Sequence, residues 1–204
     1  MKRFLRAAIA AAALATCSVS AFADLSFSGN LAGDNDVKLF SFALVSTSDV
    51  TLRTWSYAGG TNAAGNLIAA GGFDPIVSLF FGSGNPAILL DANDDGLGVP
   101  VDSGTGFAYD ALLESFALPA GTYTVALTQF ANFAIGPTLG DGFLDAGVLD
   151  FDGRTSAWAL DILMTGSTPV PLPGTLALLF SGLVAAVATR RFGSGVKPPR
   201  RESP

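Results

Sequence analysis

The stretch Val37–Leu44 reads VKLFSFAL, and the stretch Val50–Tyr57, which follows after five residues, reads VTLRTWSY. In both stretches the side chains alternate with a period of two, so Phe40 and Phe42 share one face of an extended strand while Leu39 lies on the other. β-Branched and aromatic residues dominate both stretches, and strands favour these residue types. The pattern therefore predicts two half-buried β-strands.

Further stretches with this composition are bounded by Gly, Asp, Asn or Pro, and Asp-Gly pairs supply natural turns between them. They are Ile76–Phe81, Ala87–Leu90, Leu112–Leu118, Tyr123–Phe130 and Ala157–Leu163. Seven or eight short strands in about 140 residues predict an all-β fold, an antiparallel β-sandwich. A helical turn or two is expected only near residues 108–115, and a long, mobile loop over the glycine-rich residues 58–72.

Charge is distributed unevenly along the chain. The net charge is −6, but sixteen acidic and only three basic residues lie between Asp24 and Asp161, so this segment has a charge of −13. Such a surface repels phosphate backbones and attracts divalent cations, so no nucleic-acid partner is expected. The chain has no histidine, and its one cysteine, Cys17, precedes this segment. Ser-His-Asp catalysis, Cys-His catalysis and the usual zinc ligand sets are therefore excluded.

The first 23 residues have the pattern of a secretory signal peptide. Basic residues at positions 2, 3 and 6 precede a run of nine apolar residues at positions 7–15. Ala21 and Ala23 provide the small side chains that signal peptidase requires at positions −3 and −1. We therefore predict a signal peptide over residues 1–23 and an exported domain that begins at Asp24.

A second apolar segment lies near the C-terminus. A helix that begins at Pro173 would have 17 residues before the first arginine, or about 26 Å, slightly less than the hydrocarbon core of a bilayer. Arg190 and Arg191 follow it and can extend their side chains to the membrane surface. The arginines place the C-terminus in the cytoplasm. We predict a transmembrane helix within residues 169–191 and a cytoplasmic basic tail over residues 192–204.

Residues 170–179 read VPLPGTLALL, and with the helix and the arginines they resemble the PEP-CTERM sorting signal of Gram-negative bacteria. Pro171, Pro173, Arg190 and Arg191 match the family pattern, whereas Leu172 occupies the position of the family's glutamate. The resemblance implies that an exosortase at the inner membrane cleaves near Pro171–Pro173 and releases the ectodomain or attaches it outside. Without cleavage, the helix would remain as a plain membrane anchor.

A second resemblance covers roughly residues 27–130, whose motifs follow the order of bacterial pre-peptidase C-terminal (PPC-like) domains. These motifs are the opening Asp34–Phe42, the core strand Phe73–Phe80 with its Phe-Asp-Pro start, the acidic turn Asp91–Gly96 and the closing Leu118–Val125. The resemblance implies a jelly-roll-like sandwich for the extracellular domain, residues 24–168. Residues 131–153 exceed the family pattern and are expected to form an insertion before a final strand.

The sharpest candidate site is the sequence DANDDG at Asp91–Gly96. Oxygen-bearing side chains at alternate positions, followed by glycine, are how calcium loops gather hard ligands. Asp102 is the twelfth position counted from Asp91, and Asp34 and Asp36 would complete the site if the strands bring the two loops together. The alternative is a polar hairpin turn whose aspartates cap backbone amides. The predicted calcium ligands are Asp91, Asn93, Asp95, Asp102, Asp34 and Asp36.

These patterns favour a non-catalytic, exported protein of the cell surface or extracellular matrix, and the PEP-CTERM resemblance implies an exopolysaccharide or biofilm setting. Two alternatives stay open. A carbohydrate-binding module could stack sugars on Trp55, Tyr57, Tyr109 or Trp158. A secreted polysaccharide hydrolase needs a carboxylate pair, and no two of the candidates stand out. These candidates are Asp110, Glu114, Asp141, Asp145, Asp150 and Asp152.

Overall fold

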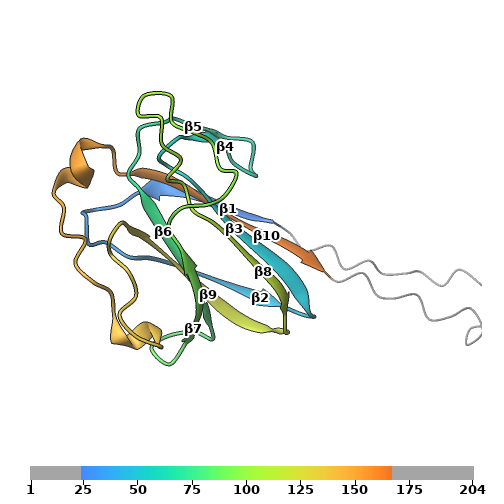
Figure 1. Cartoon of the computed structure of the whole chain (residues 1–204). Helices are drawn as coiled ribbons and strands as arrows, with labels where there is room; N and C mark the ends of the chain where they lie inside the picture. Colours follow the sequence, from blue (N-terminus) through green and yellow to red (C-terminus); the bar gives the residue numbers. More distant parts are fainter. Residues whose placement is uncertain (1–23, 167–204) are drawn as a thin grey trace, which may run out of the picture. The chain divides into compact units, whose positions relative to one another are not determined.

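A computed structural model describes residues 24–166, which form two four-stranded antiparallel β-sheets (Figure 1). Sheet A has the order β1 (Leu25–Asn30), β10 (Ala157–Gly166), β3 (Ser48–Trp55) and β8 (Leu112–Leu118). Sheet B has the order β2 (Lys38–Leu44), β9 (Gly121–Gln129), β6 (Pro75–Phe81) and β7 (Ile88–Asn93). The predicted all-β, antiparallel fold is therefore confirmed.

One hydrophobic core fills the space between the sheets. The alternation predicted for residues 37–44 is observed, because Phe42 and Leu44 are buried in this core whereas Leu39 is 52% exposed on the outer face. Leu52 from β3 and Leu160 from β10 are fully buried in the same core. Burial of alternate apolar side chains from both inner faces is what holds two such sheets together.

A second, smaller cluster covers the outer face of sheet B. Residues that follow β9 turn back over this face and place Phe143 against Phe80 of β6, with ring centroids 6.5 Å apart. The segment includes η1 (Leu139–Asp141), and η2 (Asp150–Gly153) follows it before β10. The segment predicted to be an insertion thus packs on the sheet, and β6 is buried on both faces because both faces are covered.

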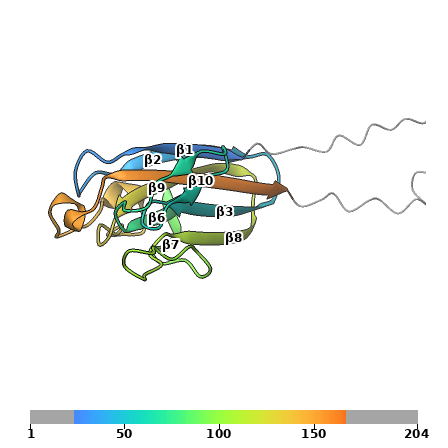
Figure 2. The same ribbon diagram turned by 90° about the horizontal axis from the view of Figure 1, so that it is seen from above.

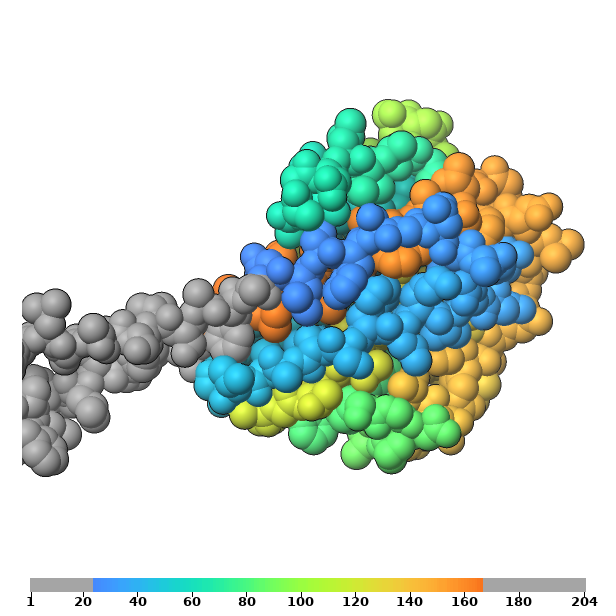
Figure 3. Space-filling model, turned by 180° about the vertical axis from the view of Figure 1, so that it is seen from behind, coloured from blue at the N-terminus to red at the C-terminus, as the bar shows by residue number. Residues whose placement is uncertain are grey.

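The glycine-rich stretch 58–72 contains a two-stranded hairpin, β4 (Gly60–Thr61) and β5 (Leu67–Ile68), in place of the uninterrupted loop that was expected. Figure 3 shows it as a lobe beside β1. Gly60 has φ +140° and lies on the ring of Trp55, which leaves no space for a side chain. This contact anchors the hairpin to sheet A.

Other expectations differ from the structure. The helical turn expected near residues 108–115 is wrong, since β8 begins at Leu112 and no helix forms there. β1 was not anticipated, because its sequence LSFSGN is short and rich in serine. No helix within residues 24–166 is long and apolar enough to cross a membrane. The predicted signal peptide, transmembrane helix and basic tail lie outside the described residues.

The first and last described strands lie side by side. β1 pairs with β10 in antiparallel register, with Leu25 opposite Ile162, and the backbone N–H of Met164 donates to Asp24 Oδ1 over 3.2 Å. Residues 24 and 166 therefore lie at one end of the sandwich, which we call the termini end (Figure 2). The turns 45–47, 82–87 and 119–120 lie at this end too. The strand ends that flank them pair with one another or with the end of β10, as Ser48 does with Gly166 and Leu44 with Gly121.

Candidate functional site at the loop end

The longer connections begin and end at the opposite end of the sandwich, which we call the loop end, although the 130–156 connection also runs back along sheet B, where the Leu139 N–H donates to the Ala87 carbonyl. They are residues 31–37, 56–74, 94–111 and 130–156. Functional side chains tend to lie on such loops because a rigid scaffold positions them while the loop sequence varies freely. Nearly all of the predicted calcium ligands and hydrolase carboxylates are on or beside these connections, so the loop end is the candidate functional site.

The predicted calcium motif is divided between a strand and a turn. Asp91 and Asn93 are in β7, and only Asp94, Asp95 and Gly96 form the turn. The Asn93 side chain links β7 to β8, because its Oδ1 accepts from the N–H of Leu112 (3.0 Å). Its Nδ2 donates to the Asp95 carbonyl (3.2 Å) and so holds the turn. Burial and the neighbouring Asp94 raise the pKa of the Asp95 carboxyl. Asn93 therefore has a structural role at this edge.

The remaining predicted ligands are engaged elsewhere. Asp102 Oδ2 forms an ion pair of 3.1 Å with Arg154, and a hydrogen bond from the Gly104 N–H, with help from Arg154, lowers the pKa of Asp102. Asp34 Oδ1 accepts from the N–H of Phe151 over 2.7 Å. Asp36 accepts from Ala32 N–H and pairs with Lys38 at 2.7 Å.

Partial burial raises the pKa of Asp36, but the hydrogen bonds from Ala32 and Lys38 outweigh that effect and lower it overall. Within residues 24–166, no three carboxylates are grouped closely enough to hold a metal ion by themselves. A calcium site built from the six predicted ligands stays a prediction.

An aromatic group, of which the sequence analysis named Tyr57 and Tyr109 but not Phe107, covers part of the loop end. The rings of Phe107 and Tyr109 stack with centroids 5.0 Å apart and an interplanar angle of 5°, and Tyr57 meets Tyr109 edge-on at 4.9 Å. The Arg154 guanidinium lies 3.6 Å from the Tyr57 ring centroid. Phe107 is 52% exposed, so one aromatic surface faces solvent. The only sequence feature that could have indicated the stack is that Phe107 and Tyr109 lie two residues apart.

The tryptophans do not join this group. Trp158 is buried in the main core, 5.5 Å from Phe40. Trp55 donates its Nε1–H to Asp161 Oδ2 over 2.7 Å. Of the four aromatic residues predicted as candidates for sugar stacking, Tyr57 and Tyr109 lie in contact with each other. The two tryptophans instead stabilise the sandwich, Trp158 by packing in the core and Trp55 by its hydrogen bond to Asp161.

Asp110, one of the candidate hydrolase carboxylates, is a buried structural group. Its carboxylate accepts hydrogen bonds from the N–H groups of Ser56 (2.6 Å), Tyr57 (3.2 Å) and Ala58 (2.9 Å), and from the Thr54 hydroxyl (3.1 Å). Burial raises the pKa of Asp110, while these hydrogen bonds act in the opposite direction. The carboxylate closes the turn that follows β3, so its oxygens are not available to a substrate.

Asp74, Gln129 and Asn132 form a polar corner where β6 begins and β9 ends. Four buried atoms in this corner have no hydrogen-bond partner within the described part of the chain: Asp74 Oδ1, Gln129 Oε1, and both Oδ1 and Nδ2 of Asn132. Burial and the nearby carboxylates of Asp95, Asp94 and Asp110 raise the pKa of Asp74 to about 8. Each unsatisfied buried group costs about 1–3 kcal/mol, so this corner is an unusual place in the fold.

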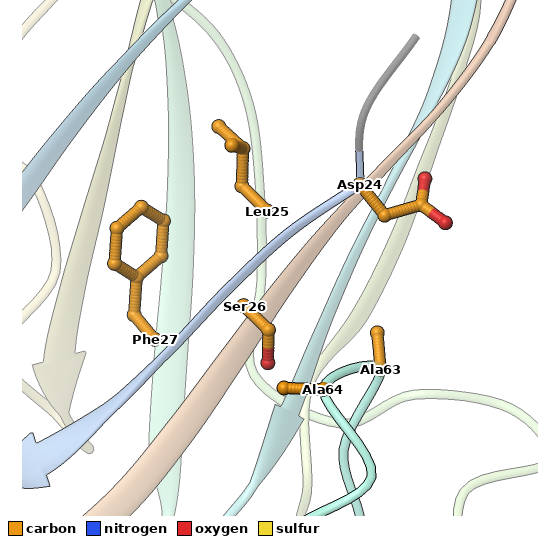
Figure 4. Close-up of a pocket in the computed structure, with 6 residues that line it drawn as sticks. All are labelled: Asp24, Leu25, Ser26, Phe27, Ala63 and Ala64. Atoms are coloured by element: carbon orange, nitrogen blue, oxygen red, sulfur yellow. The ribbon is translucent and has the colours of Figure 1, made fainter. Parts of the chain in front are cut away.

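A hollow of about 350 Å³ lies beside β1, lined by residues 24–27 and by Ala63 and Ala64 of the β4–β5 hairpin (Figure 4). Its two polar side chains are already used. Asp24 accepts from Met164, and the Ser26 hydroxyl donates to Asp161 over 2.6 Å. The hollow therefore offers little chemistry of its own.

The predicted cleavage residues Ala21 and Ala23 and the sorting residues Pro171, Leu172, Pro173, Arg190 and Arg191 lie outside the described residues. The expectation that the chain is not an enzyme also stays a prediction. In comparisons with known proteins, no family model matched the chain, and no curated protein matched it.

Proposed function

We propose that the chain is an exported, non-catalytic module that presents the loop end of its β-sandwich away from a membrane or matrix anchor. The observation that supports this proposal most strongly is the pairing of β1 with β10, which places residues 24 and 166 at the termini end. An anchor on either side of the domain would join that end. The connections 31–37, 56–74 and 94–111 would then face outward, together with the two ends of the 130–156 connection.

Sorting through a PEP-CTERM-like signal is part of the same proposal. β1 begins one residue after the predicted first mature residue, Asp24, and β10 ends at Gly166, five residues before Pro171. The predicted processing sites thus fall outside the hydrogen-bonded strands, where cleavage would leave the sandwich intact. Exosortase and the inner membrane would be transient partners, and the mature domain would act at the cell surface or in an exopolysaccharide or biofilm matrix.

The strand order supports the jelly-roll-like and PPC-like part of the proposal. In sheet A the neighbours alternate between early and late strands (β1-β10-β3-β8), and in sheet B the early strand β2 pairs with the late strand β9, followed by the hairpin β6-β7. A double-sheet jelly roll likewise has eight strands in two sheets, which supports this part of the proposal. Such folds host many unrelated activities, so the proposed function rests on the placement of termini and loops.

Surface labelling tests the proposal directly. The only cysteine is Cys17 in the predicted signal peptide, so a cysteine introduced at Ser103 on the loop end would be the sole thiol of the mature protein. A membrane-impermeant maleimide should label the Ser103→Cys variant on intact cells and leave the wild-type protein unlabelled. Labelling that occurs only after lysis would refute surface display.

Mass spectrometry of the C-terminus tests the sorting step separately. Mature protein from membrane and medium fractions should lack the segment after Pro171–Pro173. Intact Arg191 on all mature protein would refute exosortase processing while leaving surface display by a membrane anchor in place.

A carbohydrate-binding module is the second candidate, and the exposed Phe107–Tyr109 stack favours it. Sugars pack on aromatic faces, and the half-exposed Phe107 ring lies at the loop end, beside the Asp102–Arg154 ion pair. The Phe107→Ala variant should lose binding to an exopolysaccharide by tenfold or more, whereas Leu97→Ala, at a side chain that is 95% exposed, should not. Equal binding by all three proteins would exclude a role for the stack.

A further inference from the structure

Four of the six buried side-chain atoms that have no hydrogen-bond partner in residues 24–166 belong to the polar corner of Asp74, Gln129 and Asn132. Asn132 is 0% exposed and Gln129 is 2% exposed, so bulk water does not reach these amides. Buried polar groups in folded proteins are almost always paired. Such a concentration of unpaired oxygens at one place therefore indicates a ligand that supplies positive charge or hydrogen bonds.

Backbone contacts show that the three residues are neighbours. Pro75 is the register partner of Gln129, and the carbonyl of Asp74 accepts from the N–H of Phe130 over 2.9 Å. Asn132 follows in a tight turn in which its N–H donates to the Gln129 carbonyl over 2.7 Å, and its own carbonyl accepts from the Thr128 hydroxyl over 2.8 Å. The turn thus places Asn132 beside the strand end that pairs with the start of β6.

The electrostatic environment of the corner favours a cation. Asp94 and Asp95, at the end of β7, act on Asp74 together with Asp110, and all three carboxylates oppose its ionisation. The cationic group that acts in the opposite direction is Arg154, which is already paired with Asp102. A bound divalent cation would both offset this repulsion and coordinate the unpaired oxygens.

We propose that Asp74 Oδ1, Gln129 Oε1 and Asn132 Oδ1 bind a hard divalent cation, Ca²⁺, at the polar corner of the loop end. This site differs from the one expected from the DANDDG sequence. There, the Asn93 Oδ1 is occupied by a hydrogen bond from the Leu112 N–H, and Asp91 lies within strand β7. Carboxylate and amide oxygens with water are the ligands that Ca²⁺ prefers, at about 2.3–2.6 Å. A water bonded to the ion can accept from Asn132 Nδ2. The proposal does not depend on the proposed function.

The test uses the purified full-length protein in mild detergent, with thermal unfolding followed in 1 mM EDTA and in 10 mM CaCl₂. Calcium should raise Tm by about 3 °C or more, because a ligand that binds only the folded state stabilises it. MgCl₂ at the same concentration should raise it less, since Mg²⁺ gives up its water reluctantly and demands octahedral geometry. An identical wild-type Tm in EDTA and in CaCl₂ would overturn the proposal.

Two matched substitutions locate the ion. The isosteric Asp74→Asn variant should fold in EDTA and lose the calcium response, whereas Asp91→Asn, at an exposed position of β7, should retain it. If Asp74→Asn keeps the response and Asp91→Asn loses it, the ion lies at the DANDDG sequence and the polar corner is not the site.

A gain-of-function variant separates ion binding from a merely structural role. Asn132→Asp adds a carboxylate ligand, so it should lower Tm in EDTA and shift the midpoint of the calcium titration to a concentration about tenfold lower. A purely structural Asn132 would give the lower Tm without any change in that midpoint, and this result would also count against the proposal.

Discussion

Asp110 shows how one side chain holds the loop end in place. Three consecutive N–H groups after β3, those of Ser56, Tyr57 and Ala58, all donate to its carboxylate. A carboxylate that accepts several backbone hydrogen bonds acts as a cap for chain that has left the sheet ladder. Asp110 therefore fixes the direction in which the 56–74 connection leaves sheet A.

Removal of this cap should destabilise the fold. Asp110→Ala leaves two buried N–H groups and one partly buried N–H group without an acceptor, so the free energy of unfolding should fall by about 3 kcal/mol or more. Asp110→Asn keeps one acceptor oxygen and should lose roughly half as much. Urea unfolding midpoints measure both, with the exposed Asp152→Asn as a control that should change the free energy by less than about 0.5 kcal/mol. A fully stable Asp110→Ala variant would contradict the capping role.

Single residues also set the limit of what the sequence could predict about the site. The alternation of oxygen ligands in DANDDG was visible, but the extension of β7 to Asn93 depends on pairing with Val77 of the preceding strand, which the DANDDG pattern itself does not contain. Gly96 fits the glycine position of the calcium-loop pattern, yet its φ is not positive, and glycine is required there because any Cβ would overlap with Leu112. The polar corner unites residues 74, 129 and 132, and only tertiary structure brings them together.

Among the elements, the segment after β9 has an unexpected role. It covers the outer face of sheet B, so Phe80 and Ala126 are buried on a face that would otherwise meet solvent. An antiparallel sheet with one wet face shows a clean alternation of apolar and polar residues, whereas the apolar run of β6 indicates cover on both sides. The apolar run was visible in the sequence, but the sequence did not indicate which segment packs over the outer face of sheet B.

Loss of this cover should weaken the domain. Phe143→Ala removes the ring that packs edge-on against Phe80, and the free energy of unfolding should fall by about 1–3 kcal/mol because Phe143 is only half-buried. Leu144→Ala, at the neighbouring side chain that is 50% exposed, is the matched control and should have a small effect. Equal effects of the two substitutions on chemical denaturation would show that the segment does not act as a core layer.

For the whole molecule, carboxylates whose pKa is raised in the fold and carboxylates whose pKa is lowered act in opposite directions on the pH dependence of stability. The pKa of Asp110 is raised in the fold, so its contribution is greatest at low pH and is lost as pH rises through the folded value. The pKa of Asp102 is lowered, so its contribution is present above about pH 4 and is lost as pH falls through the folded value. General repulsion among the carboxylates also increases with pH.

We therefore expect the domain to be most stable in mild acid, near pH 5, and less stable at both pH 8 and pH 3. Urea midpoints measured in EDTA across this range should show the maximum, and at pH 8 added NaCl should raise the midpoint because it screens the repulsion. The Asp102→Asn variant should lose less stability between pH 5 and pH 3 than the wild-type protein. A wild-type midpoint that rises steadily from pH 5 to pH 8 would contradict this account.

The pairing of the first strand with the last determines when this protein can fold. β9 lies between β2 and β6, so sheet B cannot form before Gln129 has been synthesised; β10 lies between β1 and β3, so sheet A must wait for the last strand, Ala157–Gly166. Contacts between residues as distant as Leu25 and Ile162 form late and slowly, because a long loop must first be closed. If the chain is exported as proposed, this topology would keep it unfolded during translocation, because the sandwich can close only once its last strand has crossed the membrane.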